Sequence, residues 1–293
     1  MCECDIIFWK QFSGIILKGA FHQVHANIRI DKPEVGDHHR SGAYISIESG
    51  VDDIYNKIQV GWIVMPGWYH HICSTSTIWV RIWMEELFIT SYLGLKGGGL
   101  RLESAWFSPP PWMVSPEIEG DNNTECFYHH HCPGFMATNT SPLTLGSKLN
   151  PSKVGHDPIN VLQLTLTQDN SSGVWYFHGG PYLPTLGYWK RDYFASLTGV
   201  AGAVVARFGG EVFTPEDSKS SPPMGTGQFK YPNYYRTCYF DDIKVNSKDP
   251  VQDDLQVVET RCYLVSEVPG EVPNGFGFFF GGKGGQDMEQ CVY

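Results

Sequence analysis

The chain has few charged residues, no excess of basic ones and no long apolar run. Charged residues make up 18% of the 293 positions, and 31 acidic residues against 21 basic ones give a formal net charge of −10. That charge disfavours nucleic acid and anionic membrane surfaces as partners. No apolar run reaches the roughly 18–20 residues that a membrane-spanning helix needs. The sequence therefore predicts a globular protein with no nucleic-acid partner and no membrane span.

Cysteine is too sparse for a small disulfide-bonded scaffold. The eight cysteines are spread along the whole chain, and they fit either a secreted domain with a few bridges or a protein with free thiols in a reducing compartment. Asn-X-Ser/Thr sequons at Asn122, Asn139 and Asn170 favour the secretory route and glycosylation. The first 21 residues lack a basic head followed by a clean apolar segment, so we expect either a fragment of a longer precursor or a cytosolic chain.

Glycine and proline are plentiful, with 32 and 19 residues, and they divide the chain into short segments in which apolar and polar residues alternate. In residues 160–168, for example, Leu162, Leu164 and Leu166 share one face and polar residues share the other. Such segments are typical of half-buried β-strands joined by turns. We predict strands at 25–30, 42–49, 57–64, 76–83, 160–168, 173–179, 203–213, 236–245 and 276–282. One short helix is expected at about 190–203, and the fold class is mostly antiparallel all-β.

The ends of this pattern suggest the domain boundaries. Residues 1–24 show no clear pattern, so we expect an N-terminal segment of unclear order followed by one domain at 25–293. Within it, 63–111 is rich in glycine and proline, and a W-x-V-x-P run at 62–66 recurs at 112–116. A single echo without a fixed period is not a repeat array. We interpret 63–111 as an irregular insertion.

One stretch, ARFGGEVF at 206–213, presents a carboxylate directly after two glycines in a predicted strand. Glycines in a strand mark a bulge or a close approach of something to the backbone. Apolar neighbours would desolvate Glu211 and raise its pKa, which suits a general base. The ordinary alternative is a solvent-facing glutamate on a bulged edge, since perturbed carboxylates are a minority of all carboxylates.

Histidine-rich and glycine-rich runs offer weaker candidates. Three consecutive histidines, 129–131, stand between Cys126 and Cys132. On a strand at most two of them converge, whereas structural zinc takes four ligands. The run GGKGGQ at 281–286 lacks the strand–loop–helix context of a phosphate loop. We expect no metal site and no cofactor.

Several stretches, in order along the chain, together resemble the neprosin family of plant-type glutamic peptidases. They are KIQVGWIVMPGWY (57–69), MVSPEIEGDNNT (113–124), CFYHHHCPGF (126–135), GYWKRDYFASL (187–197), FGGEVF (208–213), PPMGTGQF (222–229) and FGFFFGGKGG with the later cysteine (276–291). The resemblance covers most of the chain from about residue 42 onward. It implies a secreted β-sandwich of two large antiparallel sheets. It also implies an endopeptidase that activates water with two glutamates, prefers to cut after proline and takes proline-rich peptides or proteins as substrates.

By this resemblance the second catalytic glutamate falls on Glu211. The first belongs to a motif I-E-x-G-W, which here reads IQVGW and places Gln59 at that position. The eqolisins, a fungal class of glutamic peptidases, pair one Glu with one Gln on a similar sandwich. On that pattern Glu211 is the base, and the Gln59 amide donates to the oxyanion, a contribution of roughly 3–4 kcal/mol. Trp62, three residues on, would face the opposite way and pack in the core.

Two alternatives stay open for the position that Gln59 occupies. The run LESAW at 102–106 also has the form apolar-Glu-x-x-Trp, so Glu103 is a rival to Gln59 as the residue that acts beside Glu211. Loss of one carboxylate also fits a catalytically impaired or inactive sandwich that binds peptide or carbohydrate.

A substrate groove is expected near the loop 222–229. Gly225 and Gly227 would let a peptide backbone come close, Gln228 would offer an amide, and Tyr188 and Trp189 would receive a proline ring. A wide hairpin loop and ordinary core aromatics are the plain alternatives.

The resemblance also implies disulfides Cys126–Cys132 and Cys262–Cys291, with free thiols as the alternative in a cytosolic protein. It implies secretion, although no signal peptide is visible in the chain.

Overall fold

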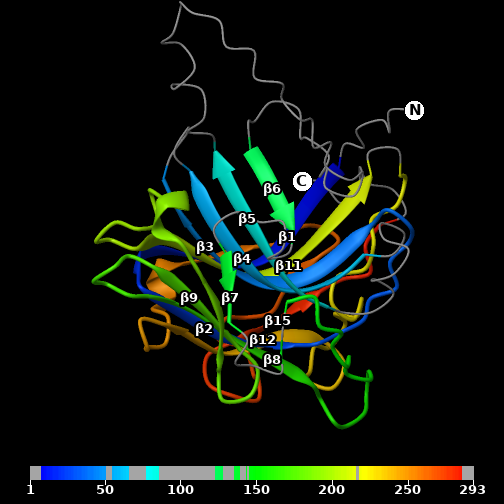
Figure 1. The fold of residues 1–293 in the computed structure, drawn as a ribbon. Coiled ribbons are helices and arrows are strands. Elements are labelled where there is room, and N and C mark those ends of the chain that lie inside the picture. The colour runs from blue at the N-terminus through cyan, green and yellow to red at the C-terminus, as the bar shows by residue number, and fades with distance from the viewer. Residues whose placement is uncertain are drawn as a thin grey trace, which may run out of the picture.

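The structure, a computed structural model, describes residues 8–50, 55–65, 77–85, 123–127, 135–138, 143, 145–215 and 218–285. In this part the chain forms two antiparallel β-sheets, with only short 3-10 turns as helical elements. The sheets lie one above the other (Figure 1). The predicted all-β, antiparallel sandwich is therefore confirmed.

The first sheet, sheet A, has the order β13-β1-β11-β3-β4-β5-β6. Its strands are β1 (Phe8–Phe21), β3 (Arg40–Ser49), β4 (Asn56–Val64), β5 (Thr77–Glu85), β6 (Asn123–Phe127), β11 (Ala203–Pro215) and β13 (Leu255–Val258). The second sheet, sheet B, has the order β14-β15-β12-β2-β8-β9-β10-β7. Its strands are β2 (Gln23–Arg29), β7 (Phe135–Ala137), β8 (Val161–Gln168), β9 (Trp175–Gly179), β10 (Thr185–Trp189), β12 (Cys238–Val245), β14 (Leu264–Val265) and β15 (Phe278–Gly281). The 3-10 turns are η2 (Arg191–Tyr193) and η3 (Gln252–Asp254).

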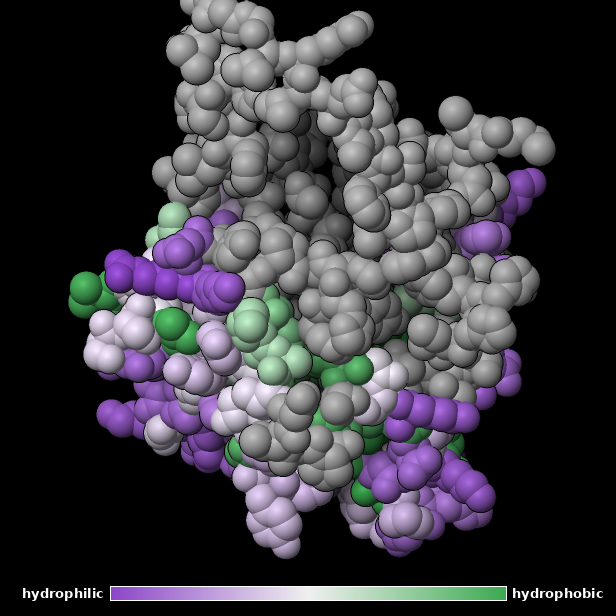
Figure 2. All heavy atoms as spheres, viewed as in Figure 1, coloured by the Kyte–Doolittle hydropathy of each residue, from purple (hydrophilic) through white to green (hydrophobic). Residues whose placement is uncertain are grey.

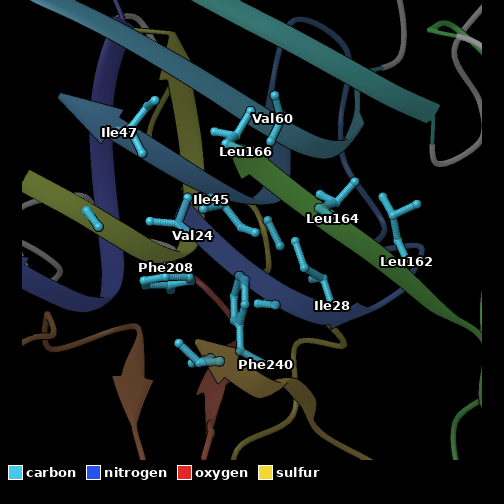
Figure 3. Packing of buried hydrophobic residues seen from close by; sticks show 14 of the residues in the cluster. Val24, Ile28, Ile45, Ile47, Val60, Leu162, Leu164, Leu166, Phe208 and Phe240 are labelled. Carbon is cyan, nitrogen blue, oxygen red and sulfur yellow. The ribbon is translucent and has the colours of Figure 1, made fainter. Parts of the chain in front are cut away.

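The core lies between the two sheets and is made by every second residue of the central strands. Ile45, Val60 and Phe208 of sheet A face Leu164 and Phe240 of sheet B (Figure 3). All five side chains have no exposed surface, so each contributes roughly 1.5–3 kcal/mol of hydrophobic stabilisation. On the side of the molecule drawn in Figure 2, the described hydrophobic residues form only small separate groups among hydrophilic ones. The alternation that predicted the strands therefore also decides which side chains are buried.

The structure differs from the sequence prediction at the N-terminus. Residues 8–21, inside the segment expected to lack clear order, form β1, which pairs with β11 over most of its length. Ile15 and Leu17 of β1 enter the core. The sequence of β1 shows no clear apolar–polar alternation, because the face opposite the core carries both a charged residue, Lys10, and a large apolar one, Phe12.

The strand predicted at 76–83 is confirmed, because residues 77–85 form β5, and β5 joins β4 to β6. This part of the stretch 63–111 therefore belongs to sheet A and not to an irregular insertion. A second segment differs from its prediction. The helix expected at 190–203 is only the 3-10 turn η2, followed by turns up to β11. Gly202 has a φ of +65° in this connection, and the β-branched pair Val204–Val205 that follows favours a strand.

The glycine pair of β11 does not form a bulge. The pairing of β11 with β1 and with β3 continues without a shift through Gly209 and Gly210. A Cβ on Gly209 would lie 2.5 Å from the Phe12 ring, and one on Gly210 would lie 2.5 Å from the Met224 sulfur. The pair is therefore explained by close packing on both faces of the strand.

No helix in the described ranges has the length and apolar character needed to cross a membrane.

Candidate active site

The face of sheet A that points away from the core carries a row of mostly polar residues. Because directly paired residues of neighbouring strands point to the same side, the register puts these side chains together. We call this set the outer polar face. It consists of Tyr44, Ser46 and Glu48 on β3, Lys57 and Gln59 on β4, and Arg207 and Glu211 on β11.

Glu211 is held in a buried position on this face. Its residue is only 2% exposed. The Tyr44 hydroxyl donates a hydrogen bond of 2.9 Å to Oε2, and the Lys10 ammonium lies 2.8 Å from the same oxygen. Lys10 lies on the neighbouring strand β1, two residues before Phe12, which pairs with Glu211. The carboxylate is thus shielded from solvent, and its charge is compensated by one cation and one phenol.

Tyr44 connects Glu211 to the rest of the outer polar face. Burial, and after it the charge of Glu211, raises the pKa of the Tyr44 phenol well above its usual range. The phenol therefore keeps its proton and acts as a hydrogen-bond donor. The Lys57 ammonium lies 5.6 Å from the centroid of the Tyr44 ring, within the range of a cation–π contact.

Glu48 is the centre of a second charged group on the same face. Its Oε1 lies 3.2 Å from the Lys57 ammonium and 2.8 Å from Arg207 Nε, and the Ser46 hydroxyl donates to it at 3.2 Å. Burial would raise the pKa of Glu48, but the two cations and their hydrogen bonds outweigh it and lower that pKa to about 2. Glu48 is therefore ionised and holds the side chains of Lys57 and Arg207 in place.

Lys57 is affected in the opposite direction. Burial, followed by repulsion from Lys10, lowers the pKa of the Lys57 ammonium to about 7, although Glu48 and Glu211 oppose the shift. Lys10, Lys57, Glu48 and Glu211 thus form one electrostatically coupled group.

Gln59 lies on the outer polar face with no exposed surface. Neither its amide nitrogen nor its amide oxygen has a hydrogen-bond partner in the structure as described. Gln59 pairs with Ser46, whereas Glu211 pairs with Gly42 of the same strand β3. Four residues of a strand correspond to roughly 13 Å, so the two positions share a face without being adjacent, and Tyr44 stands between them on β3.

The residues predicted to form a substrate groove are not brought together. Gly225 and Gly227 lie in a loop that contacts β15 through the Met224–Gly282 bridge. β10, which carries Tyr188 and Trp189, is separated from β15 in sheet B by β12, β2, β8 and β9. The aromatic part of the predicted groove therefore lies far from its loop.

The local environments explain why these groove residues have other roles. Trp189 is 1% exposed and packs in the core with its ring centroid 4.9 Å from that of Phe135. Gly225 has a φ of +61°, and a Cβ there would lie 2.5 Å from Cβ of Cys238. The glycine is thus required by its conformation and its packing. Only Gln228 has an exposed side chain.

Other predicted positions have mixed outcomes. Trp62 has no exposed surface and lies in the core, as predicted. Glu103 and the histidines 129–131 lie outside the described residues.

The predicted modifications are tested only at single positions. Cys262 is disulfide-bonded, but Cys291 and Cys132 are outside the described residues, so both pairings stay predictions. Asn170 is exposed on the turn between β8 and β9, and the sequons at Asn122 and Asn139 lie outside the described ranges.

Sequence reasoning did not find Tyr44, Lys10, Glu48, Lys57 or Arg207. A signal existed for four of them, since Arg207 shares a strand face with Glu211 in the predicted strand 203–213. In GAYISIES the isoleucines occupy one face, so the other face must hold Tyr44 and Glu48 together, and Lys57 has the same relation to Gln59. Lys10 had no such signal, because β1 was not predicted.

The family model described as Neprosin matches residues 111–283, more than half of the chain, and the match includes Glu211 but neither Gln59 nor Tyr44. Among curated proteins none matches.

Two solved structures are similar to the chain at 12% sequence identity, each over 94% of this chain and 99% of theirs. One is scytalido-glutamic peptidase with a peptide-based transition-state analogue, at a TM-score of 0.44, and the other is SCP-B, a member of the eqolisin family of peptidases, in a complex with the tripeptide Ala-Ile-His, at 0.43. On the extent of the family match, the chain belongs to the neprosin family.

Proposed function

We propose that the protein is a peptidase of the glutamic type in which Glu211 is the general base. The observation that carries the proposal is the buried Glu211 carboxylate, bound by Tyr44 and Lys10 on a polar face of the sheet. Membership of the neprosin family, with Glu211 inside the matched range, supports it. Buried carboxylates with specific charged partners are enriched at functional sites.

The proposed reaction needs no group besides the protein, the peptide and water. Glu211 takes a proton from water while the water oxygen forms a bond to the carbonyl carbon of the substrate. The carbonyl oxygen gains negative charge in the tetrahedral intermediate. When the C–N bond breaks, Glu211 returns the proton to the leaving amine, so the carboxylate is regenerated.

Tyr44 and Lys10 are positioning residues in this scheme. Both bind Oε2 of Glu211, and two fixed contacts hold the carboxylate in one orientation. A base held in place before substrate arrives avoids the cost of ordering it during the reaction.

Gln59 is proposed as a hydrogen-bond donor to the substrate carbonyl oxygen. Its buried amide has no partner within the described structure, and an unsatisfied buried polar group costs about 1–3 kcal/mol. A substrate carbonyl would supply that partner. A peptide that contacts both Glu211 and Gln59 would lie across Tyr44.

The family resemblance supports a finer proposal, that the enzyme cleaves on the carboxyl side of proline. It also supports the proposal that the protein is secreted. The test uses a set of peptides that differ only by proline or alanine at one position, incubated with the refolded chain from pH 3 to pH 7. We expect cleavage after proline in the wild type, a rate lower by about 100-fold or more in Glu211→Gln and a reduced kcat in Gln59→Ala. Cleavage by Glu211→Gln at the wild-type rate would refute the assigned base, and equal cleavage at proline and alanine would refute only the specificity.

Secretion has a separate test. Expression through a secretory pathway should give a glycosylated protein, because Asn170 is exposed. The Asn170→Gln variant should then be lighter by one glycan in a mass measurement. Equal masses would count against glycosylation at this sequon.

A second candidate function is a non-catalytic sandwich that binds peptide. The specific observation in its favour is the 2.8 Å ion pair between Lys10 and Glu211, together with Gln59 in place of a second carboxylate. On this alternative a proline-rich peptide binds without turnover, and Glu211→Gln leaves its affinity unchanged. Turnover that depends on Glu211 excludes it.

A further inference from the structure

Sheet B has a cavity on the face that points away from the core, and hence on the opposite side of the sandwich from the outer polar face. Its volume is about 410 Å³, within the usual range of small-ligand pockets. The lining side chains come mainly from β2, β8, β9 and β12: Gln23, His25, Thr165, Thr167, His178 and Lys244. We call this the sheet B cavity. The inward neighbours Val24, Leu164 and Leu166 belong to the core, so the cavity rests on a well-packed floor.

Two histidines in the cavity are fixed by hydrogen bonds to threonines. His25 Nδ1 lies 2.7 Å from the Thr165 hydroxyl, and His178 Nε2 lies 2.9 Å from the Thr167 hydroxyl. His178 Nδ1 is also 3.1 Å from the hydroxyl of Thr185. Burial lowers the pKa of His25, although Asp242 opposes the shift, and burial also lowers the pKa of His178. The lowered pKa favours the neutral form of each ring, in which one nitrogen donates and the other accepts, and the threonine hydroxyls keep the capacity for a further hydrogen bond.

The cation of the cavity is already compensated. The Lys244 ammonium lies 2.6 Å from an Asp249 carboxylate oxygen and 3.4 Å from one of Asp242. Asp242 is also 3.4 Å from His25 Nε2. The cavity consequently presents hydroxyl, imidazole and amide groups beside the apolar Leu183, with little net charge, an arrangement that does not favour phosphate or carboxylate ligands.

Aromatic rings continue from His178 along the same outer face of β9 and β10. The Tyr176 ring is stacked with His178, with centroids 6.5 Å apart and planes at 28°, and Tyr188 follows at 5.8 Å from Tyr176. Both tyrosines are half-buried. An aromatic platform next to groups that both donate and accept hydrogen bonds matches a sugar ring, which has an apolar C–H face and an edge of hydroxyls.

We propose that the sheet B cavity binds neutral carbohydrate, with the hydroxyls of Thr165 and Thr167 hydrogen-bonding to sugar hydroxyls, His25 and His178 holding those two hydroxyls in place, and Tyr176 supporting the face of a ring. The site is independent of the proposed peptidase site, because the two lie on opposite outer faces of the sandwich. Tyr188, expected from the sequence to hold proline, lies beyond Tyr176 on this outer face.

The test is a calorimetric titration of the full chain at pH 7 with maltotetraose, cellotetraose and mannotetraose, and with an oligogalacturonate as the acidic counterpart. We expect saturable binding of at least one neutral tetrasaccharide and weaker binding of the acidic one. His178→Ala should weaken the neutral ligand at least tenfold, whereas Tyr231→Ala, which removes an 80% exposed tyrosine outside the cavity lining, should not.

Thr167→Val guards against a folding defect, because it keeps the shape of the side chain and removes only the hydroxyl. It should also weaken binding. The Glu211→Gln variant should bind as the wild type does, so loss of peptidase activity and loss of sugar binding remain distinguishable. No binding of any neutral tetrasaccharide, preference for the acidic one, or binding that survives both cavity variants would overturn the proposal.

Discussion

The outer faces of the two sheets both carry a lysine paired with a carboxylate, but in very different surroundings. Lys57 lies 3.2 Å from Glu48 with side chains 7% and 3% exposed, and Lys244 lies 2.6 Å from Asp249 with side chains 31% and 59% exposed. The buried lysine has its pKa lowered to about 7, whereas the pKa of the exposed one is raised by its partner. The shorter pair is the more exposed one. Burial, and not the distance between the charges, therefore decides what each pair does to its lysine.

Among variants of the two pairs, Glu48→Ala is expected to change the free energy of unfolding the most. Removing the carboxylate takes the closest anion from two cations, Lys57 and Arg207, and breaking a buried pair costs about 3–5 kcal/mol. Chemical denaturation at pH 7 should show this loss in the free energy of unfolding. A change in the free energy of unfolding below about 1 kcal/mol would mean that the outer polar face is hydrated and that the Lys57–Glu48 pair does not differ from an exposed pair.

The acid stability of the protein should depend on the same residue. The pKa of Glu48 is about 2 in the folded state against 4.5 without the fold. Stability from this group is thus fully present above about pH 4.5 and is lost as the pH falls toward 2. The loss amounts to roughly 3 kcal/mol. Glu48→Gln should flatten the measured stability between pH 4.5 and 2 relative to the wild type, and an unchanged slope would contradict the assignment.

A smaller effect is expected from Tyr44→Phe, which removes only the hydroxyl that binds Glu211. We expect kcat/KM for peptide cleavage to fall about tenfold, or about 1.4 kcal/mol. The matched control is Tyr263→Phe, which removes a buried hydroxyl that donates to Pro222 at 2.6 Å. That variant should lose about 1 kcal/mol of stability with unchanged cleavage. Equal kinetic effects in both would show that Tyr44 acts only through the fold.

The smallest effect is expected from Asp249→Asn on sheet B. Although its contact with Lys244 is short, exposed pairs contribute about 0–1 kcal/mol. The free energy of unfolding should change by less than about 0.5 kcal/mol. A loss of stability as large as that in Glu48→Ala would contradict the claim that burial, and not distance, separates the two pairs.

The sequence predicted the strands whose two faces differ clearly. The alternation at 42–49, 57–64 and 160–168 corresponds to β3, β4 and β8. It failed where both faces carry large or charged residues, as in β1, because Phe12 and Lys10 point to the outer face and conceal the pattern. The helix expected near 190–203 failed for another reason, since glycine and β-branched residues there favour turns and a strand.

The candidate site was only partly visible in the sequence. Glu211 and Gln59 were singled out by family resemblance, and both are buried on the same face of sheet A. Tyr44 and Lys10 contact Glu211 from strands 167 residues and about 200 residues away along the chain. Only the register of β1, β3 and β11 brings them together. Such contacts follow from strand pairing, which local patterns do not specify.

The most direct test of the account is the cleavage rate of Glu211→Gln on a proline-containing peptide, measured beside the wild type and beside the thermal stability of both proteins. Loss of a general base should lower kcat/KM by about 100-fold or more, while cooperative unfolding of the variant shows that the sandwich is intact. Cleavage by the folded variant at the wild-type rate would contradict the claim that this buried carboxylate activates water.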